Sequence, residues 1–286
     1  MAVRLGDAVV VKVRAWGLGV ALLLVCAALP VRALAAEPAD GSLVTYTAFD
    51  KSTHRLRQLN GVYTAALLAD ADLARYGEAR ARDLIDRYDI LYAHYVELMG
   101  REPGGTGLLH VAFVQTCGGG CGYIGSRGIE LEPASLGPQA APGTDGAYTY
   151  AVHEMAHNFD FYSSFIMYGP DVAHAWTDFM NPYVKFYDQG GLLGLSPADW
   201  VQDGVARYFE LYTDYPGRTW RKCVRDNACA PQQAMAQHAQ GGALLRLAQV
   251  HGPQAVKRMI RHLRDAIAQR ALDAKAMTVR EKNDLL

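Results

Sequence analysis

The chain has 286 residues, of which 50% are hydrophobic and 20% charged, and its 28 basic and 29 acidic side chains give a formal net charge of −1. A chain of this length and composition can bury a sizeable core as one large domain or as two lobes. The balanced charge argues against a nucleic-acid-binding protein.

The first 35 residues resemble a secretory signal peptide. Basic side chains near the start precede an apolar run over residues 15–31, and a small-residue stretch follows at 33–36. Cleavage after Ala35 fits the Ala-x-Ala rule. The run is short for a bilayer crossing, so we expect a periplasmic or secreted protein without stable membrane insertion after cleavage, and an uncleaved membrane anchor is the competing interpretation.

Cleavage would also make the protein more acidic. It removes four basic residues and one acidic residue, which leaves 24 basic and 28 acidic side chains and a formal charge of −4. The mature domain would comprise residues 36–286.

The first half of this domain is predicted to combine helices with short strands. The hydrophobic patterns predict strands at 43–48, 108–114 and 128–131, and helices at 56–68 and 73–98. A mixed sheet is therefore expected before residue 132.

Four cysteines follow the signal peptide as two closely spaced pairs, Cys117 with Cys121 and Cys223 with Cys229. An even number in an exported protein predicts disulfides, and the spacing favours one within each pair. The competing interpretation is a second zinc site, for which the nearest histidine, His110, lies on the strand before the first pair.

Residues 153–157 read His-Glu-Met-Ala-His, within a helix expected from Ala147 to about Tyr162. Four residues of helix bring His153 and His157 to one face, where both imidazoles can bind one zinc ion. Glu154 lies about 100° round the helix, where it can accept a proton from zinc-bound water. The competing interpretation makes the histidines core residues that bond to backbone carbonyls.

The second half is predicted to be mainly helical. Helices are expected at 173–187, from Ser196 to Tyr212, and within the amphipathic tail at 232–270. Ser196 is a natural N-cap, and Pro197 suits the first helical position.

A catalytic zinc site normally takes a third protein ligand. The metzincin pattern would place a histidine where Ser163 stands, so that branch is excluded. Asp160 lies almost a full turn beyond His157, where it is better placed to orient an imidazole than to bind the ion.

With its His-Glu-x-x-His run and the later segment 203–212, the chain resembles the gluzincin branch of the zincin metallopeptidases, including peptidases related to the anthrax lethal-factor catalytic domain. The resemblance covers about residues 108–212. It implies that a carboxylate on the later helix completes the zinc site, which assigns this role to Asp203, where the family often has glutamate. Glu210, seven residues on, is the competitor.

The resemblance also implies an α+β, zincin-like metallopeptidase fold, in which a small mixed sheet and the metal helix lie above a mainly helical lower lobe that begins near residue 165. It implies that residues 122–131 form the edge strand to which a peptide substrate adds by backbone hydrogen bonds. Tyr183, Tyr187 and His174 are candidates for stabilising the oxyanion, and each of them is otherwise a packing or surface residue.

The sequence therefore predicts an exported zinc-dependent peptidase with one catalytic Zn²⁺, a peptide or protein substrate, and Glu154 as general base. The alternative is an exported zinc-binding module that binds cell-wall material or a protein partner without catalysis. The intact Glu154 favours the enzyme, because a structural zinc site needs no general base.

Overall fold

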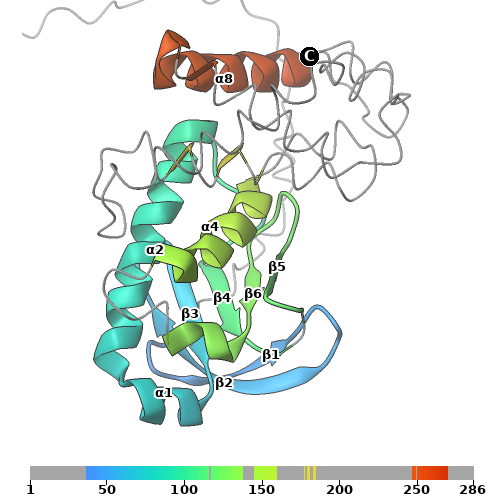
Figure 1. Ribbon diagram of the computed structural model, residues 1–286. Helices are drawn as coiled ribbons and strands as arrows, with labels where there is room; N and C mark the ends of the chain where they lie inside the picture. Colours follow the sequence, from blue (N-terminus) through green and yellow to red (C-terminus); the bar gives the residue numbers. More distant parts are fainter. Residues whose placement is uncertain are drawn as a thin grey trace, which may run out of the picture. The chain divides into compact units, whose positions relative to one another are not determined.

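The computed structural model describes residues 37–115, 117–137, 145–159, 177, 179–180, 183–184, 247–248 and 250–269. The predicted signal peptide, the helix from Ser196 to Tyr212, the pair Cys223 and Cys229 and most of the predicted lower lobe lie outside these residues. The described part has an α+β fold with a six-stranded mixed sheet and four α-helices (Figure 1). None of the helices in these ranges is long and apolar enough to cross a membrane.

The sheet has the strand order β1-β2-β3-β4-β6-β5. The first three strands are antiparallel, β3, β4 and β6 run parallel, and β5 is antiparallel to β6 at the edge. The strands are β1 (Leu43–Thr47), β2 (Thr53–Asn60), β3 (Thr64–Leu68), β4 (Leu109–Phe113), β5 (Gly120–Gly122) and β6 (Ile129–Leu131).

Helices α2 and α4 cover one face of this sheet (Figure 1). Alternate residues of β4 and β6, among them Val111, Phe113 and Ile129, point to this face and are fully buried against the helices. The helices are α1 (Asp70–Tyr76), α2 (Glu78–Met99), α4 (Asp145–Phe159) and α8 (Pro253–Gln269), with a 3₁₀ turn at Pro133–Ser135.

The predicted helix at 56–68 is wrong, because this segment forms the hairpin of β2 and β3. Asn60-Gly61 begins the turn between the two strands. Strand β3 is buried on both faces, so its sequence lacks the alternation of polar and apolar residues that would distinguish a strand from a helix. Asp89 of α2 fixes the turn, since its carboxylate accepts hydrogen bonds from the backbone N–H groups of Val62, Tyr63 and Thr64 at 2.5–2.9 Å.

The other predicted elements of the first half are confirmed with small shifts. Strands occur at 43–47, 109–113 and 129–131. The helix predicted at 73–98 is present, but it is divided into α1 and α2 at Gly77, whose φ of 86° lies in the region that favours glycine.

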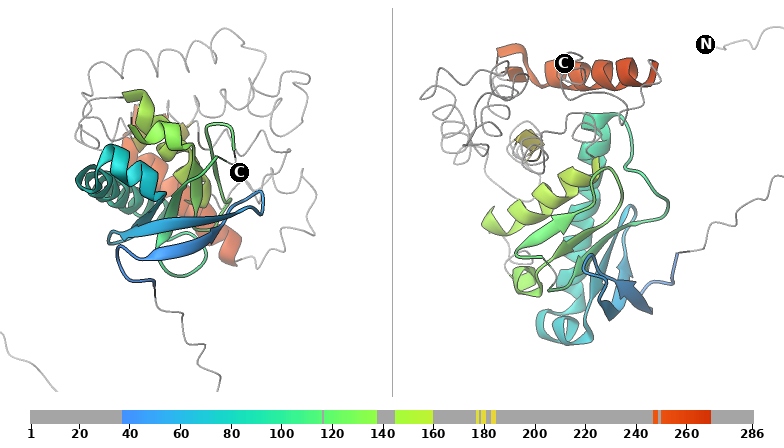
Figure 2. Two further views of the ribbon diagram at one scale, coloured as in Figure 1. Left: turned by 90° about the horizontal axis from the view of Figure 1, so that it is seen from below. Right: turned by 90° about the vertical axis from the view of Figure 1, so that its right-hand side faces the viewer.

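The second face of the sheet, away from α4, is formed by the β1–β2 hairpin together with β3 and β4 (Figure 2). Leu56, Leu67 and Ala112 form a small core there. The turn after β1 reaches as far as β6, because Phe49 donates its backbone N–H to Glu130.

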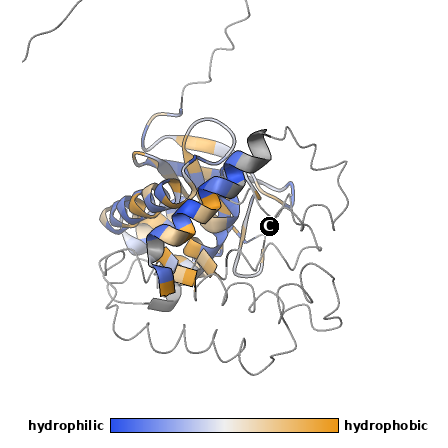
Figure 3. Cartoon of the chain, turned by 90° about the horizontal axis from the view of Figure 1, so that it is seen from above, coloured by the Kyte–Doolittle hydropathy of each residue, from blue (hydrophilic) through white to orange (hydrophobic). Residues whose placement is uncertain are grey.

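Helix α8 packs against the C-terminal end of α2, and hydrophilic and hydrophobic residues alternate along it (Figure 3). Val256 and Ile260 are buried in the main core. Arg261 donates to the carbonyl oxygen of Glu97 at 2.9 Å, and Arg264 donates to that of Gly100 at 2.7 Å. These cations therefore satisfy the last carbonyls of α2 and its negative dipole end.

Candidate metal centre

Helix α4 brings together the side chains of the predicted metal motif. One ligand atom from each of His153, Glu154 and His157 lies within 4.8 Å of the others. The two imidazole rings are edge to face, with centroids 5.1 Å apart and an interplanar angle of 82°. Glu154 Oε2 lies 4.0 Å from His157 Nε2. This is the arrangement that the four-residue spacing predicts for a helix.

Hydrogen bonds hold α4 on both sides of this motif. The Tyr95 hydroxyl of α2 donates to the carbonyl oxygen of Val152 at 2.6 Å. After the motif, the fully buried Asn158 donates its side-chain amide to the carbonyl oxygens of Tyr123 and Gly128, both at 2.9 Å. The helix is thus fixed to α2 before His153 and to the loop after β5 beyond His157.

Strand β5 lies directly against α4 at the motif, and two glycines permit this approach. A Cβ on Gly122 would lie 2.2 Å from the carbonyl oxygen of Glu154, and a Cβ on Gly120 would lie 2.9 Å from Glu154 Cγ. Any other residue at either position would push the strand away from the helix. The backbone N–H of Gly125 also donates to the carbonyl oxygen of His157 at 2.8 Å, which attaches the last residue of the motif to the loop after β5.

Glu154 is buried, with a relative exposure of 7%. Burial raises the pKa of its carboxyl to about 7, because the charged form loses its hydration there. A carboxyl with a pKa near neutrality can accept and release a proton at physiological pH, as a general base must.

His153 has a further neighbour that the sequence patterns did not indicate. The hydroxyl of Thr177, a fully buried residue, lies 3.3 Å from His153 Nε2. A threonine hydroxyl at this distance can orient the imidazole. Thr177 falls within the predicted helix 173–187, but no spacing rule connects it to the motif.

The remaining predicted site residues fall into two groups. Tyr183 is buried in the main core and packs on Phe179 with ring centroids 5.1 Å apart, which fits the packing role. The others lie outside the described residues; these are Asp160, His174, Tyr187, Asp203 and Glu210.

The predicted edge strand at 122–131 needs correction. The strand at the edge of the sheet is β5, over Gly120–Gly122, and 129–131 forms β6, one position further in. The prediction missed β5 because three consecutive glycines before Cys121 read as a loop.

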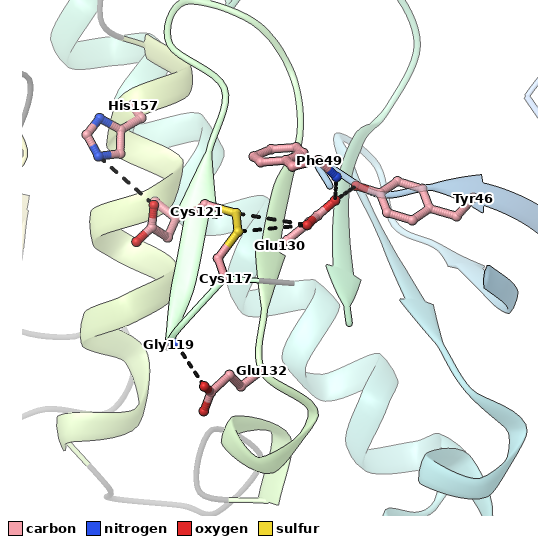
Figure 4. The surroundings of a disulfide bond; sticks show 9 residues. Tyr46, Phe49, Cys117, Gly119, Cys121, Glu130, Glu132 and His157 are labelled. Carbon is pink, nitrogen blue, oxygen red and sulfur yellow. Dashed lines mark hydrogen bonds and ion pairs between the residues drawn. A yellow bond between two sulfur atoms is a disulfide. The ribbon is translucent and has the colours of Figure 1, made fainter. Parts of the chain in front are cut away.

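The first predicted cysteine pair includes a residue of this strand, since Cys121 lies in β5 and Cys117 precedes it. The sulfur atoms of Cys117 and Cys121 are at disulfide distance, and the Cα atoms are 5.9 Å apart. His110 is not grouped with them, and the charged side chain that faces the sulfurs is instead that of Glu130 (Figure 4).

Comparison with known proteins assigns no family to the chain. No family model matches it, and no curated protein or solved structure does so.

Proposed function

We propose that the protein is an exported zinc-dependent peptidase with a zincin-like fold. The observation that carries this proposal is the position of two imidazoles and a buried carboxylate on one turn of α4, beside an antiparallel edge strand. His153 and His157 would hold the zinc ion, and Asp203 would be the third ligand.

The donor set fits this metal. Two imidazole nitrogens and a carboxylate are a ligand set that catalytic Zn²⁺ accepts, with a fourth position left for water. When bound, zinc supplies a Lewis acid that polarises the scissile carbonyl and lowers the pKa of water. Glu154 would then be the general base, since its buried carboxylate lies on the same turn of α4 as the two imidazoles, where it could accept a proton from water and pass it to the leaving amine.

Strand β5 offers a docking edge for an extended peptide. Tyr123 donates its N–H to Gly128, and Glu132 donates its N–H to Gly119. Hydrogen-bonded pairs alternate along an antiparallel ladder, so Gly120 and Gly122 turn their N–H and C=O groups away from β6. A peptide that pairs with these groups would lie beside Glu154, which supports the peptide as substrate.

Zinc analysis together with digestion of a mixed peptide library tests the proposal. The mature protein should bind one zinc ion and hydrolyse peptide bonds, a chelator should abolish hydrolysis, and added zinc should restore it. His153→Ala and His157→Ala should lose the metal, whereas His54→Ala, on the distant strand β2, should retain it. Zinc binding without hydrolysis would favour a non-catalytic binding module, and absence of zinc binding would refute the proposal.

A further inference from the structure

We propose that Cys117, Cys121 and Glu130 form a second metal site, which binds Zn²⁺ when the disulfide between the two cysteines is reduced. This site uses none of the residues of the proposed peptidase centre and does not depend on that function.

The three side chains already have nearly the separation that a zinc ion requires. Glu130 Oε2 lies 4.0 Å from the sulfur of Cys117 and 3.9 Å from that of Cys121 (Figure 4). Tetrahedral zinc with ordinary bond lengths separates a sulfur from an oxygen ligand by about 3.5 Å. The two sulfurs must separate to about 3.8 Å once reduced, and the loop permits this because zinc-binding cysteines commonly have two to four residues between them, and Cys117 and Cys121 have three.

The backbone sets this geometry. Cys121 of β5 and Glu130 of β6 are direct cross-strand partners, so their side chains leave the sheet on the same face. The Cα hydrogens of Gly120 and Gly122 that stand in place of side chains point to the opposite face, toward Glu154. The proposed second site and the peptidase centre therefore lie on opposite faces of one short strand.

Glu130 is held in place as a ligand should be. It is fully buried, and its Oε1 accepts hydrogen bonds from the Tyr46 hydroxyl at 2.9 Å and from the backbone N–H of Phe49 at 2.7 Å. These two donors fix the carboxylate and direct Oε2 to the sulfurs, as residues around a metal ligand do. A buried carboxylate is costly, and a dication at Oε2 would compensate its charge.

Cys117 and Cys121 are both half-buried, and Gly118 between them is exposed, so a reductant and a metal can reach the sulfurs. A dithiol would reduce the pair by thiol–disulfide exchange. The dithiol is oxidised to a disulfide, and its two hydrogens are transferred to Cys117 and Cys121, which become free thiols. Binding of Zn²⁺ then releases two protons to solvent and forms two sulfur–zinc bonds, with Glu130 as third ligand and solvent in the fourth position.

Cadmium titration of the mature chain tests this site, since Cd²⁺ bound by thiolate gives an ultraviolet charge-transfer band that imidazole ligands do not. The chain carries Cys223→Ser and Cys229→Ser to remove the other thiols, and the dithiol is removed under nitrogen before titration. The reduced protein should show the band, the oxidised protein should not, and adding Cys117→Ser with Cys121→Ser should abolish it. The band should persist in His153→Ala, which separates this result from the fate of the peptidase proposal.

Two carboxylate variants test the third ligand. Glu130→Gln should weaken Cd²⁺ binding at least tenfold with both thiols still titratable, whereas Glu132→Gln should leave it unchanged. Glu132 is the matched control because it lies in the same segment but accepts a hydrogen bond from Gly119 instead of facing the sulfurs (Figure 4). Absence of the band in the reduced protein, or equal affinity in the two folded variants, would overturn the proposal. If Glu130→Gln does not fold, the comparison of reduced with oxidised protein still decides whether the two cysteines bind the metal.

Discussion

Replacement of Gly122 by alanine should separate β5 from the metal helix. The new Cβ would lie 2.2 Å from the carbonyl oxygen of Glu154, 3.0 Å from its carbonyl carbon and 3.2 Å from His157 Cβ. Two of these atoms belong to the backbone of α4, which Tyr95 and Asn158 hold in place, so they cannot move aside as a flexible side chain would. The strand must therefore move by roughly 1 Å to restore ordinary contact distances.

Overpacking of this kind costs about 1–3 kcal/mol, and contact with fixed backbone places Gly122→Ala in the upper half of that range. Urea denaturation of the metal-free protein measures the change in the free energy of unfolding. Gly118→Ala is the matched control, because a Cβ there has no atom within 4 Å and should change stability by less than about 1 kcal/mol. If the two variants have equal stability, β5 does not lie against α4 as described.

Three further predictions concern the site and its support. Asp203→Ala should lower zinc affinity sharply while Glu210→Ala leaves zinc bound, and the reverse result in a zinc titration would exchange their roles. Asn158→Ala should lower the free energy of unfolding by about 1–3 kcal/mol, because it removes the donor to two carbonyl oxygens of the β5–β6 loop. An unchanged midpoint of urea denaturation would show that these hydrogen bonds do not stabilise the loop. Burial lowers the pKa of His110 below its usual 6.5, so the unfolded chain takes up a proton at a higher pH than the folded protein does. The free energy of unfolding should therefore decline as the pH falls below about 6.5. His110→Gln should show a smaller decline when urea denaturation is repeated over the same pH range.

The sequence predicted best those features that depend on spacing along one element. The motif at 153–157 required only that the segment be helical, and α4 brings its side chains together as expected. The strands at 109–113 and 129–131 were also found, because β-branched and other apolar residues bounded by glycine are typical of short buried strands.

Features that depend on tertiary contact were missed. Strand β5, with the sequence Gly-Cys-Gly, carries no hydrophobic pattern, and it is a strand because its glycines let it pair with β6 while it packs against α4. Thr177 stands 24 residues from His153, and no local pattern links them. The cysteine pair was recognised, but its carboxylate neighbour Glu130 was not, because strand pairing and not sequence proximity brings it to Cys121.

The central claim is that Glu154 acts as the general base of a zinc peptidase, and the most direct test compares Glu154→Gln with the wild-type protein at equal zinc occupancy. Glutamine keeps the size of the side chain but cannot accept the proton. Peptide hydrolysis should therefore fall by about 10²- to 10⁴-fold while the zinc content stays the same. Hydrolysis at the wild-type rate by the zinc-loaded variant, with contaminating peptidases excluded, would contradict the account.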